Sequence, residues 1–260
     1  MRYQRIKHIL EPPYAEIQLI PAGGPITIDE LLAAEIIDIC DELLFQDDIR
    51  VVSITGQGQA FATGRISPPA DIVGADSSQQ LDWINGLKAA GAVAGLPMPV
   101  VAVLNGDATA HGLELALAAD LRIAADFVVV AAGKIGQVGF PFDGATQRLP
   151  RLVGPALARD MLLTGRTLTA SECLDAGLVN RVVAANELSA AARALASKIV
   201  DAAPIASRFA KEAVNAAGDM TLAQGLRLEA DLSIILQSTS DREEGLLAFR
   251  EKRVARFLGR

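Results

Sequence analysis

Two polar side chains, His111 and Glu114, stand where a buried apolar run gives way to a helix-like segment, in residues 105–114 (NGDATAHGLE). Backbone N–H groups at the start of a helix have no intrahelical partner and carry the positive end of the helix dipole, so they can hold an oxyanion. A glutamate in the first turn beside such a site could act as a general acid or base. It could equally stabilise the helix without taking part in any reaction, because a carboxylate interacts favourably with the positive end of the helix dipole. The spacing alone leaves both interpretations open.

A second loop that could bind a ligand follows an earlier apolar run, in residues 54–65 (ITGQGQAFATGR). Its glycines allow sharp turns that present backbone N–H groups to a ligand. Gly56, Gly58 and Gly64 match neither the dinucleotide-binding GxGxxG spacing nor the phosphate-binding P-loop, and no Gly-Lys-Ser/Thr follows them. The segment is therefore either a ligand-binding turn of another kind or a plain surface loop.

The elements that must position these loops alternate between strands and helices. Helical spacing predicts a helix capped by Thr27 or Asp29, and further helices at 79–94, 112–119 and 169–176. Apolar runs predict strands at 3–10, 15–20, 51–55, 99–104, 121–124, 127–131 and 178–183. This alternation is typical of βαβ units, whose parallel strands carry ligands beyond their carboxyl ends. From Glu187 onward the pattern is helical, so we expect an α/β core over residues 1–200 and a helical region over 201–260.

The composition narrows the class of partner. The chain has 260 residues, 51% of them hydrophobic, with 31 acidic against 24 basic residues and a net charge of −7. This balance argues against nucleic-acid binding and against adsorption to anionic membranes, and the 4% of aromatic residues argues against base-stacking platforms.

The sequence also predicts a compartment. The first residues lack the apolar core of a secretory signal, and no window supplies the roughly 18 apolar residues of a membrane span. Cys40 and Cys173 lie in helix-like runs and are too few for a disulfide scaffold or a Cys-rich metal site. We expect buried reduced thiols, no metal and a cytoplasmic location.

The two loops together resemble those of the crotonase (enoyl-CoA hydratase/isomerase) superfamily. Four further segments are similar to that family in the same order, namely TQRL at 146–149, LTGR at 163–166, AGLV at 176–179 and AFREKR at 248–253. The resemblance implies a spiral of ββα units in the core and a C-terminal helical region that assembles chains into a trimer or a dimer of trimers. It also implies an acyl-CoA thioester as substrate, with coenzyme A as part of that substrate and no separate cofactor.

The resemblance assigns roles to four residues of the candidate site. Members stabilise a thioester enolate with two backbone N–H groups, which fall here at Arg65 and His111. In the hydratases two glutamates hold a water molecule and move protons. Glu114 matches the first, and Lys134 stands where the second is expected.

The resemblance also implies contacts with coenzyme A. The adenine is expected near Ala60 and Ala62, and Phe249 and Lys252 match C-terminal residues that reach the coenzyme A of a neighbouring subunit. A solvated helix charge is the alternative interpretation of Lys252.

Lys134 is the departure from the family with the largest consequence. A protonated lysine has three donors and no acceptor, so it cannot deprotonate water as a glutamate does. If it lies against Glu114, the two side chains form an ion pair. If it points to solvent instead, the site has decayed or been repurposed.

Three more residues depart from the family pattern. Arg65 could pair with a carboxylate of the substrate, or turn outward to solvent or to a phosphate of coenzyme A. His111 has a counterpart in carbon–carbon-cleaving β-diketone hydrolases, but those use additional histidines and this chain has only His8 besides. Asp143, in the segment PFDG at 141–144, could replace the missing carboxylate or simply form a turn before glycine.

We therefore expect an enzyme that processes an acyl-CoA thioester through an enolate, most closely a hydratase or isomerase with Glu114 as the proton carrier. A decarboxylase or carbon–carbon-bond hydrolase is an alternative, with Arg65 or Lys134 holding the carboxylate of a carboxylated or 1,3-dicarbonyl substrate and His111 or Lys134 supplying a proton. A non-catalytic member that retains only the acyl-CoA pocket is a third.

Overall fold

The computed structural model describes residues 2–260, and its framework is a six-stranded sheet in the order β1-β2-β3-β4-β6-β9. Strands β1 and β2 pair antiparallel, and the other neighbours in this sheet pair parallel. The strands are β1 Ile6–Glu11, β2 Tyr14–Leu19, β3 Val51–Gly56, β4 Val100–Leu104, β6 Leu121–Ala125 and β9 Arg181–Val183. A second sheet, in the order β5-β7-β8, is built from β5 Ala108–Thr109, β7 Val129–Ala131 and β8 Thr167–Thr169. The α/β class that the sequence predicts is confirmed.

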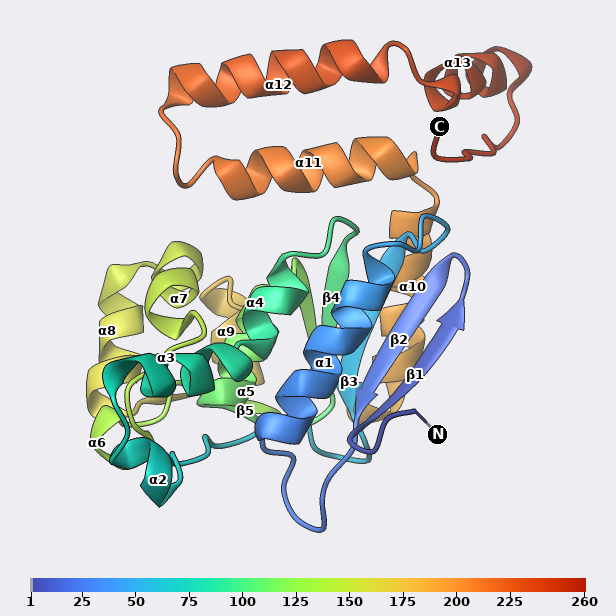
Figure 1. The fold of residues 1–260 in the computed structure, drawn as a ribbon. Helices are drawn as coiled ribbons and strands as arrows, with labels where there is room; N and C mark the ends of the chain where they lie inside the picture. Colours follow the sequence, from blue (N-terminus) through green and yellow to red (C-terminus); the bar gives the residue numbers. More distant parts are fainter. Residues whose placement is uncertain (1) are drawn as a thin grey trace.

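Helices cover both faces of the large sheet. Helices α1 (Glu30–Leu43) and α4 (Ala89–Ala94) lie on one face, and α10 (Leu188–Val200) packs against β3, β4 and β6 on the other (Figure 1). Strand β4 has the sequence VVAVL and is buried at every position, as a parallel strand covered on both faces must be. Asp29, one of the two caps that the sequence offers for α1, accepts a hydrogen bond from the Leu32 N–H and begins that helix.

The prediction of a single helix over residues 79–94 is wrong. The structure has two helices there, α3 (Ser77–Gly86) and α4, which are separated at Leu87 and Lys88. Leu87 is fully buried whereas α3 contains no buried residue, so the chain turns at this point to bring α4 into the core. Gly86 at the end of α3 is a weak helix former, which lowers the cost of the break.

The remaining helices of the core are short. They are α2 Ala70–Val73, α5 His111–Ala118, α6 Ile135–Val138, α7 Ala145–Val153, α8 Pro155–Thr164, α9 Ala170–Asp175 and a 3₁₀ turn at Ala185–Glu187. Helix α5 differs from the others because all of its residues are buried, so any group it carries sits inside the protein.

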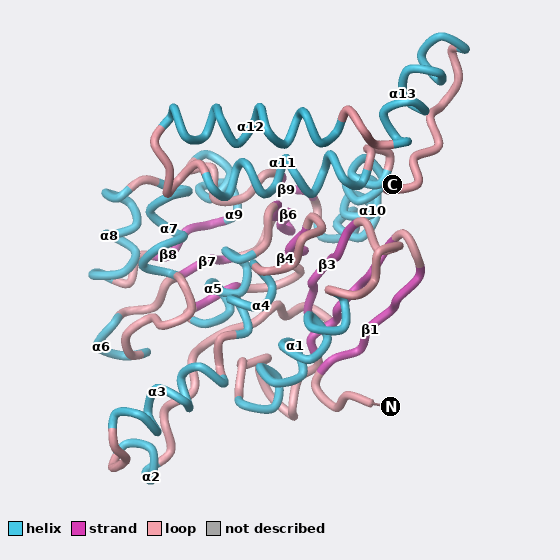
Figure 2. Tube along the Cα trace, turned by 45° about the horizontal axis from the view of Figure 1, so that its top comes forward, coloured by secondary structure: helices cyan, strands magenta, loops and turns pink. Residues whose placement is uncertain are grey.

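The expected helical region, 201–260, contains α11 (Pro204–Ala216), α12 (Leu222–Leu236) and α13 (Ser240–Glu251). Figures 1 and 2 show α11 and α12 side by side across one end of the molecule, with α13 beyond the end of α12. They expose large apolar side chains, among them Val214, Leu222, Ile234 and Phe249. None of the helices within residues 2–260 combines the length and the apolar character needed to cross a membrane.

Candidate active site

The two loops singled out in the sequence leave the carboxyl ends of β3 and β4 and are tied together by hydrogen bonds. The Asn105 side chain accepts a hydrogen bond from the Gly56 N–H at 3.0 Å and donates one to the Gly56 carbonyl at 2.8 Å. Further along, the Thr109 N–H donates to the Ala62 carbonyl at 3.1 Å. A Cβ at Gly112 would lie 1.9 Å from the Ala62 carbonyl oxygen, so only glycine permits this close approach. The two predicted loops therefore form one site.

The turn that enters α5 carries backbone strain. Ala110 has φ 51° and ψ −114°, a conformation that a residue with a side chain rarely adopts. The next residue, His111, begins α5, and its N–H donates to the Gly64 carbonyl at 3.1 Å. The Arg65 N–H has no hydrogen-bond partner among the described residues. Of the two N–H groups expected to bind an oxyanion, one has no protein partner and the other is bonded within the protein.

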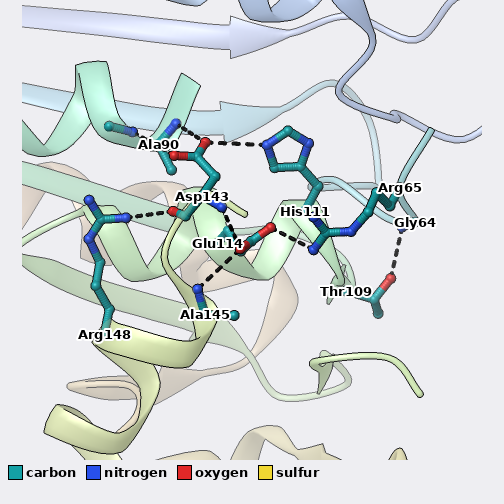
Figure 3. Close-up of polar contacts among 10 residues, drawn as sticks. Gly64, Arg65, Ala90, Thr109, His111, Glu114, Asp143, Ala145 and Arg148 are labelled. Atoms are coloured by element: carbon teal, nitrogen blue, oxygen red, sulfur yellow. Dashed lines mark hydrogen bonds and ion pairs between the residues drawn. The ribbon is translucent and has the colours of Figure 1, made fainter. Parts of the chain in front are cut away.

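Glu114 is fully buried and its carboxylate accepts three hydrogen bonds (Figure 3). Its Oε1 accepts from the backbone N–H groups of Asp143 at 2.9 Å and Ala145 at 3.1 Å. Its Oε2 accepts from Nη2 of Arg65 at 2.6 Å, in an ion pair whose two side chains are 0% and 4% exposed. Three N–H donors match a deprotonated carboxylate, which can only accept.

The Lys134 side chain does not contact the Glu114 carboxylate. Lys134 precedes α6, its side chain is exposed, and within residues 2–260 no ion pair joins the two groups. Its Cβ lies beside Gly165, where an added Cβ would be 3.0 Å away. Of the two orientations considered for Lys134, the structure shows the one toward solvent, and Glu114 pairs with Arg65 instead. The outward orientation considered for the Arg65 side chain is wrong, because that side chain is buried against Glu114.

Asp143 is 4% exposed and anchors a helix from a distant segment. Its two carboxylate oxygens accept from the N–H groups of Ala90 at 2.7 Å and Gly91 at 3.0 Å, at the start of α4. Its Oδ2 also lies 3.3 Å from Nε2 of His111, which is fully buried. Asp143 is thus more than a turn former, since it fixes α4 and the His111 ring together.

The Arg65 guanidinium packs against the aromatic ring of Phe142, a residue that sequence reasoning did not select. Its Cζ lies 4.6 Å from the centroid of the Phe142 ring, which also contacts the His111 ring edge to face at 5.0 Å. Nε and Nη1 of Arg65 and Nδ1 of His111 are buried and have no hydrogen-bond partner among the described residues. No signal in the sequence identified Phe142, because a phenylalanine before Asp-Gly is ordinary in a loop.

The residues expected to contact coenzyme A fall into two groups. Ala60 is half-buried and Ala62 is buried in the loop that carries Arg65. Phe249 is 85% exposed in α13, and Lys252 follows that helix with a left-handed φ of 55°. Figures 1 and 2 show α13 standing apart from α5, so within one chain Phe249 and Lys252 do not join the site.

The remaining metal-ligating and nucleophilic side chains form no further reactive centre among the described residues. In the part of the chain that the structure describes, no cluster of three or more His, Cys, Asp or Glu side chains could hold a metal ion. Burial raises the pKa of the free thiols of Cys40 and Cys173 to about 12, so both are protonated and unreactive at neutral pH.

A family model described as Enoyl-CoA hydratase/isomerase matches residues 26–260. The chain belongs to the enoyl-CoA hydratase/isomerase family. YngF of Bacillus subtilis, an enoyl-CoA hydratase/isomerase by name, is 41% identical to it over 226 residues, which are 85% of each chain. The (E)-benzylidenesuccinyl-CoA hydratase of Thauera aromatica is 34% identical over 242 residues, 90% of this chain and 91% of that protein.

Solved structures show the same fold for this member of the enoyl-CoA hydratase/isomerase family. The crystal structure of an enoyl-CoA hydratase from Bacillus anthracis matches it with a TM-score of 0.91 and 33% identity, covering 99% of this chain and 100% of that one. The crotonase fold expected from the sequence motifs is thereby confirmed.

Proposed function

We propose that this protein adds water to, or shifts, the double bond of an enoyl-CoA thioester through an enolate intermediate, with Glu114 as the proton carrier. The observation that carries the proposal is the fully buried Glu114 carboxylate in the first turn of α5, paired with the side chain of Arg65, whose backbone N–H has no partner among the described residues. A buried carboxylate next to an N–H donor for a developing oxyanion is the arrangement that enolate chemistry needs. Membership of the family, and the hydratase names of its relatives, support the same class of reaction.

Hydration moves one proton twice. The oxygen of a water molecule bonds to C3 of the enoyl group while Glu114 takes a proton from that water. The electron pair of the C2–C3 double bond moves toward the thioester, whose oxygen becomes the oxyanion and accepts from the Arg65 N–H. Glu114 then returns the proton to C2, which restores the thioester and the ionised carboxylate. In isomerisation the same carboxylate takes a proton from one carbon and returns it to another.

The hydrogen bonds of the site define what must change during turnover. Oε1 of Glu114 accepts two hydrogen bonds and Oε2 accepts one, so a lone pair of Oε2 is left for the proton. The His111 N–H becomes the second oxyanion donor when it exchanges the Gly64 carbonyl for the thioester oxygen. The exposed position of Lys134 argues against proton transfer by that residue, and we assign it none.

The same proposal places the adenine of coenzyme A near Ala60 and Ala62. Phe249 and Lys252 then serve a neighbouring copy in a trimer or dimer of trimers, which the exposed apolar side chains of α11, α12 and α13 support. Sedimentation analysis tests the assembly, and a monomer at micromolar concentration would contradict it. The free buried thiols fit a reducing compartment such as the cytoplasm.

The test of the reaction is incubation with crotonyl-CoA, monitored by loss of the absorbance of the conjugated enone. The wild-type protein should consume the enone, and Glu114→Gln should be slower by at least about 100-fold, the usual contribution of a general acid–base group. Lys134→Ala is the matched control and should stay within about threefold of wild type, because its side chain is exposed and takes no part in the Glu114 ion pair. Absence of turnover at high enzyme concentration, or full activity in a folded Glu114→Gln protein, would refute the assignment.

A second candidate function is acyl-CoA binding without catalysis. It is favoured by one observation, namely that both oxygens of Glu114 and the His111 N–H are all engaged within the protein. Calorimetric binding of acyl-CoA esters with no turnover across a panel of enoyl-CoA substrates would establish this function instead.

A further inference from the structure

The Arg65 side chain is buried, but few of its donors have a hydrogen-bond partner. A guanidinium has five N–H donors, and the one hydrogen bond given to this side chain joins Nη2 to Glu114. Nε and Nη1 are buried without a partner among the described residues. One face of the group lies against the Phe142 ring, with Cζ 4.6 Å from the ring centroid, so the unpaired donors lie in the plane of the guanidinium and not against the ring.

Another buried arginine of the chain shows what a structural role looks like. Arg122 is 4% exposed, and its Nε donates to the Leu178 carbonyl at 2.7 Å while its Nη1 donates to the carbonyls of Ala116 and Ala119. Nε and Nη1 of Arg122 thus donate to backbone carbonyls, which is how folds normally accommodate a buried guanidinium. Among the described residues, no backbone carbonyls accept hydrogen bonds from Nε or Nη1 of Arg65. These two nitrogens are therefore suited to bind a ligand, whereas those of Arg122 stabilise the fold.

The carboxylates already present do not need the unused donors. The Glu114 carboxylate accepts hydrogen bonds from two backbone N–H groups as well as from Nη2 of Arg65. The Asp143 carboxylate accepts from two backbone N–H groups at the start of α4 and lies next to Nε2 of His111. The unpaired Nε and Nη1 of Arg65 therefore call for an acceptor from outside the protein. A carboxylate is the acceptor that a guanidinium fork matches best in charge and geometry.

We propose that the site is built for an acyl-CoA whose acyl group carries a second carboxylate, and that the free donors of Arg65 bind it. This inference rests on the proposed function, because it places the acyl group beside Glu114. The Arg65–Glu114 contact of 2.6 Å sets the position of that carboxylate within a few bonds of the reacting carbons. The substrate class is thus a short dicarboxylic acid joined to coenzyme A through one carboxyl group.

The test compares two non-reactive esters of equal length, glutaryl-CoA and pentanoyl-CoA, by calorimetry. The wild-type protein should bind glutaryl-CoA about 10- to 100-fold more tightly, the effect of a hydrogen bond to a charged partner. Arg65→Met should remove the preference by weakening glutaryl-CoA alone, and Arg65→Lys should restore part of it because the charge returns without the fork. Circular dichroism checks that each variant is folded. If a variant does not fold, the comparison of the two esters on the wild-type protein still tests the inference.

The outcomes separate this inference from the proposed function. Equal affinity for the two esters, or equal weakening of both by Arg65→Met, would overturn the inference, the latter by showing that Arg65 serves the thioester. A turnover assay with glutaconyl-CoA and 2-pentenoyl-CoA provides the second measurement. Turnover of 2-pentenoyl-CoA at the same rate or faster overturns the carboxylate preference and leaves the proposed function standing. A clear glutaryl-CoA preference without turnover of either enoyl ester supports the inference and refutes the reaction.

Discussion

Replacing Glu114 by glutamine leaves a buried guanidinium without its counter-charge. The glutamine oxygen can still accept from the N–H groups of Asp143 and Ala145, but its NH₂ group then takes the place of Oε2, 2.6 Å from Nη2 of Arg65. Donor then faces donor in a site where both side chains are less than 5% exposed. Removing one partner of a buried ion pair costs about 3–5 kcal/mol, so we expect Glu114→Gln to lower the free energy of unfolding by that amount.

Replacing Arg65 by methionine should cost less. Glu114 keeps its two backbone donors, and the two unpaired nitrogens of Arg65 disappear with the side chain. We expect a loss at the lower end of the range of about 3–5 kcal/mol for breaking a buried ion pair, because the backbone donors still stabilise the Glu114 charge. In the double variant no charge is left unpaired, so its loss should be smaller than the sum of the two single losses, with a coupling energy of about 2–3 kcal/mol.

Urea unfolding at neutral pH and at one fixed protein concentration gives the four free energies of this cycle, provided that the m-values agree. The control cycle uses Arg227 and Asp231, an i,i+4 pair whose side chains are 79% and 48% exposed, and it should give a coupling of about 0.3–0.5 kcal/mol. Additive effects at Arg65 and Glu114 within about 0.5 kcal/mol would show that the buried ion pair does not hold the site together.

Three further perturbations follow from single observations. Ala110→Gly should raise the free energy of unfolding by about 1 kcal/mol in the same urea assay, because glycine adopts φ 51° without strain, and a loss of stability would contradict this. Hydrogen bonds from the Arg253 side chain, and to a lesser degree from the Arg256 N–H, lower the pKa of Glu244 to about 2. The stabilisation that this carboxylate gives the folded C-terminal segment is therefore present above the ordinary carboxyl pKa and is lost as the pH falls toward 2. Pepsin should therefore cleave the C-terminal segment of the wild type increasingly as the pH falls from the ordinary carboxyl pKa toward 2. The Glu244→Gln variant should be cleaved to the same extent already at the upper end of this pH range. Cys40 and Cys173, with pKa values raised to about 12 by burial, should react with a thiol reagent at pH 8 only after unfolding, and fast labelling of the native protein would refute their burial.

Local patterns in the sequence were sufficient for the framework. The apolar run that forms β4 predicts a buried strand, and Thr27 and Asp29 are the two caps that the sequence offers for α1, because both predictions depend on neighbouring residues alone. The break between α3 and α4 was missed for the opposite reason. It depends on the burial of Leu87 and on a carboxylate, Asp143, that reaches the start of α4 from 53 residues along the chain.

The sequence by itself determined the family, the α/β class and the two loops that meet around Glu114, because these depend on motif order and on hydrophobic periodicity. Only the tertiary structure decided that Arg65 turns inward and pairs with Glu114, a residue 49 positions away, while Lys134 remains at the surface. A long side chain has several rotamers of similar energy on an isolated segment, and packing against Phe142 together with the charge of Glu114 selects one of them. The chemical identity of the site therefore comes from contacts between distant segments that no local pattern contains.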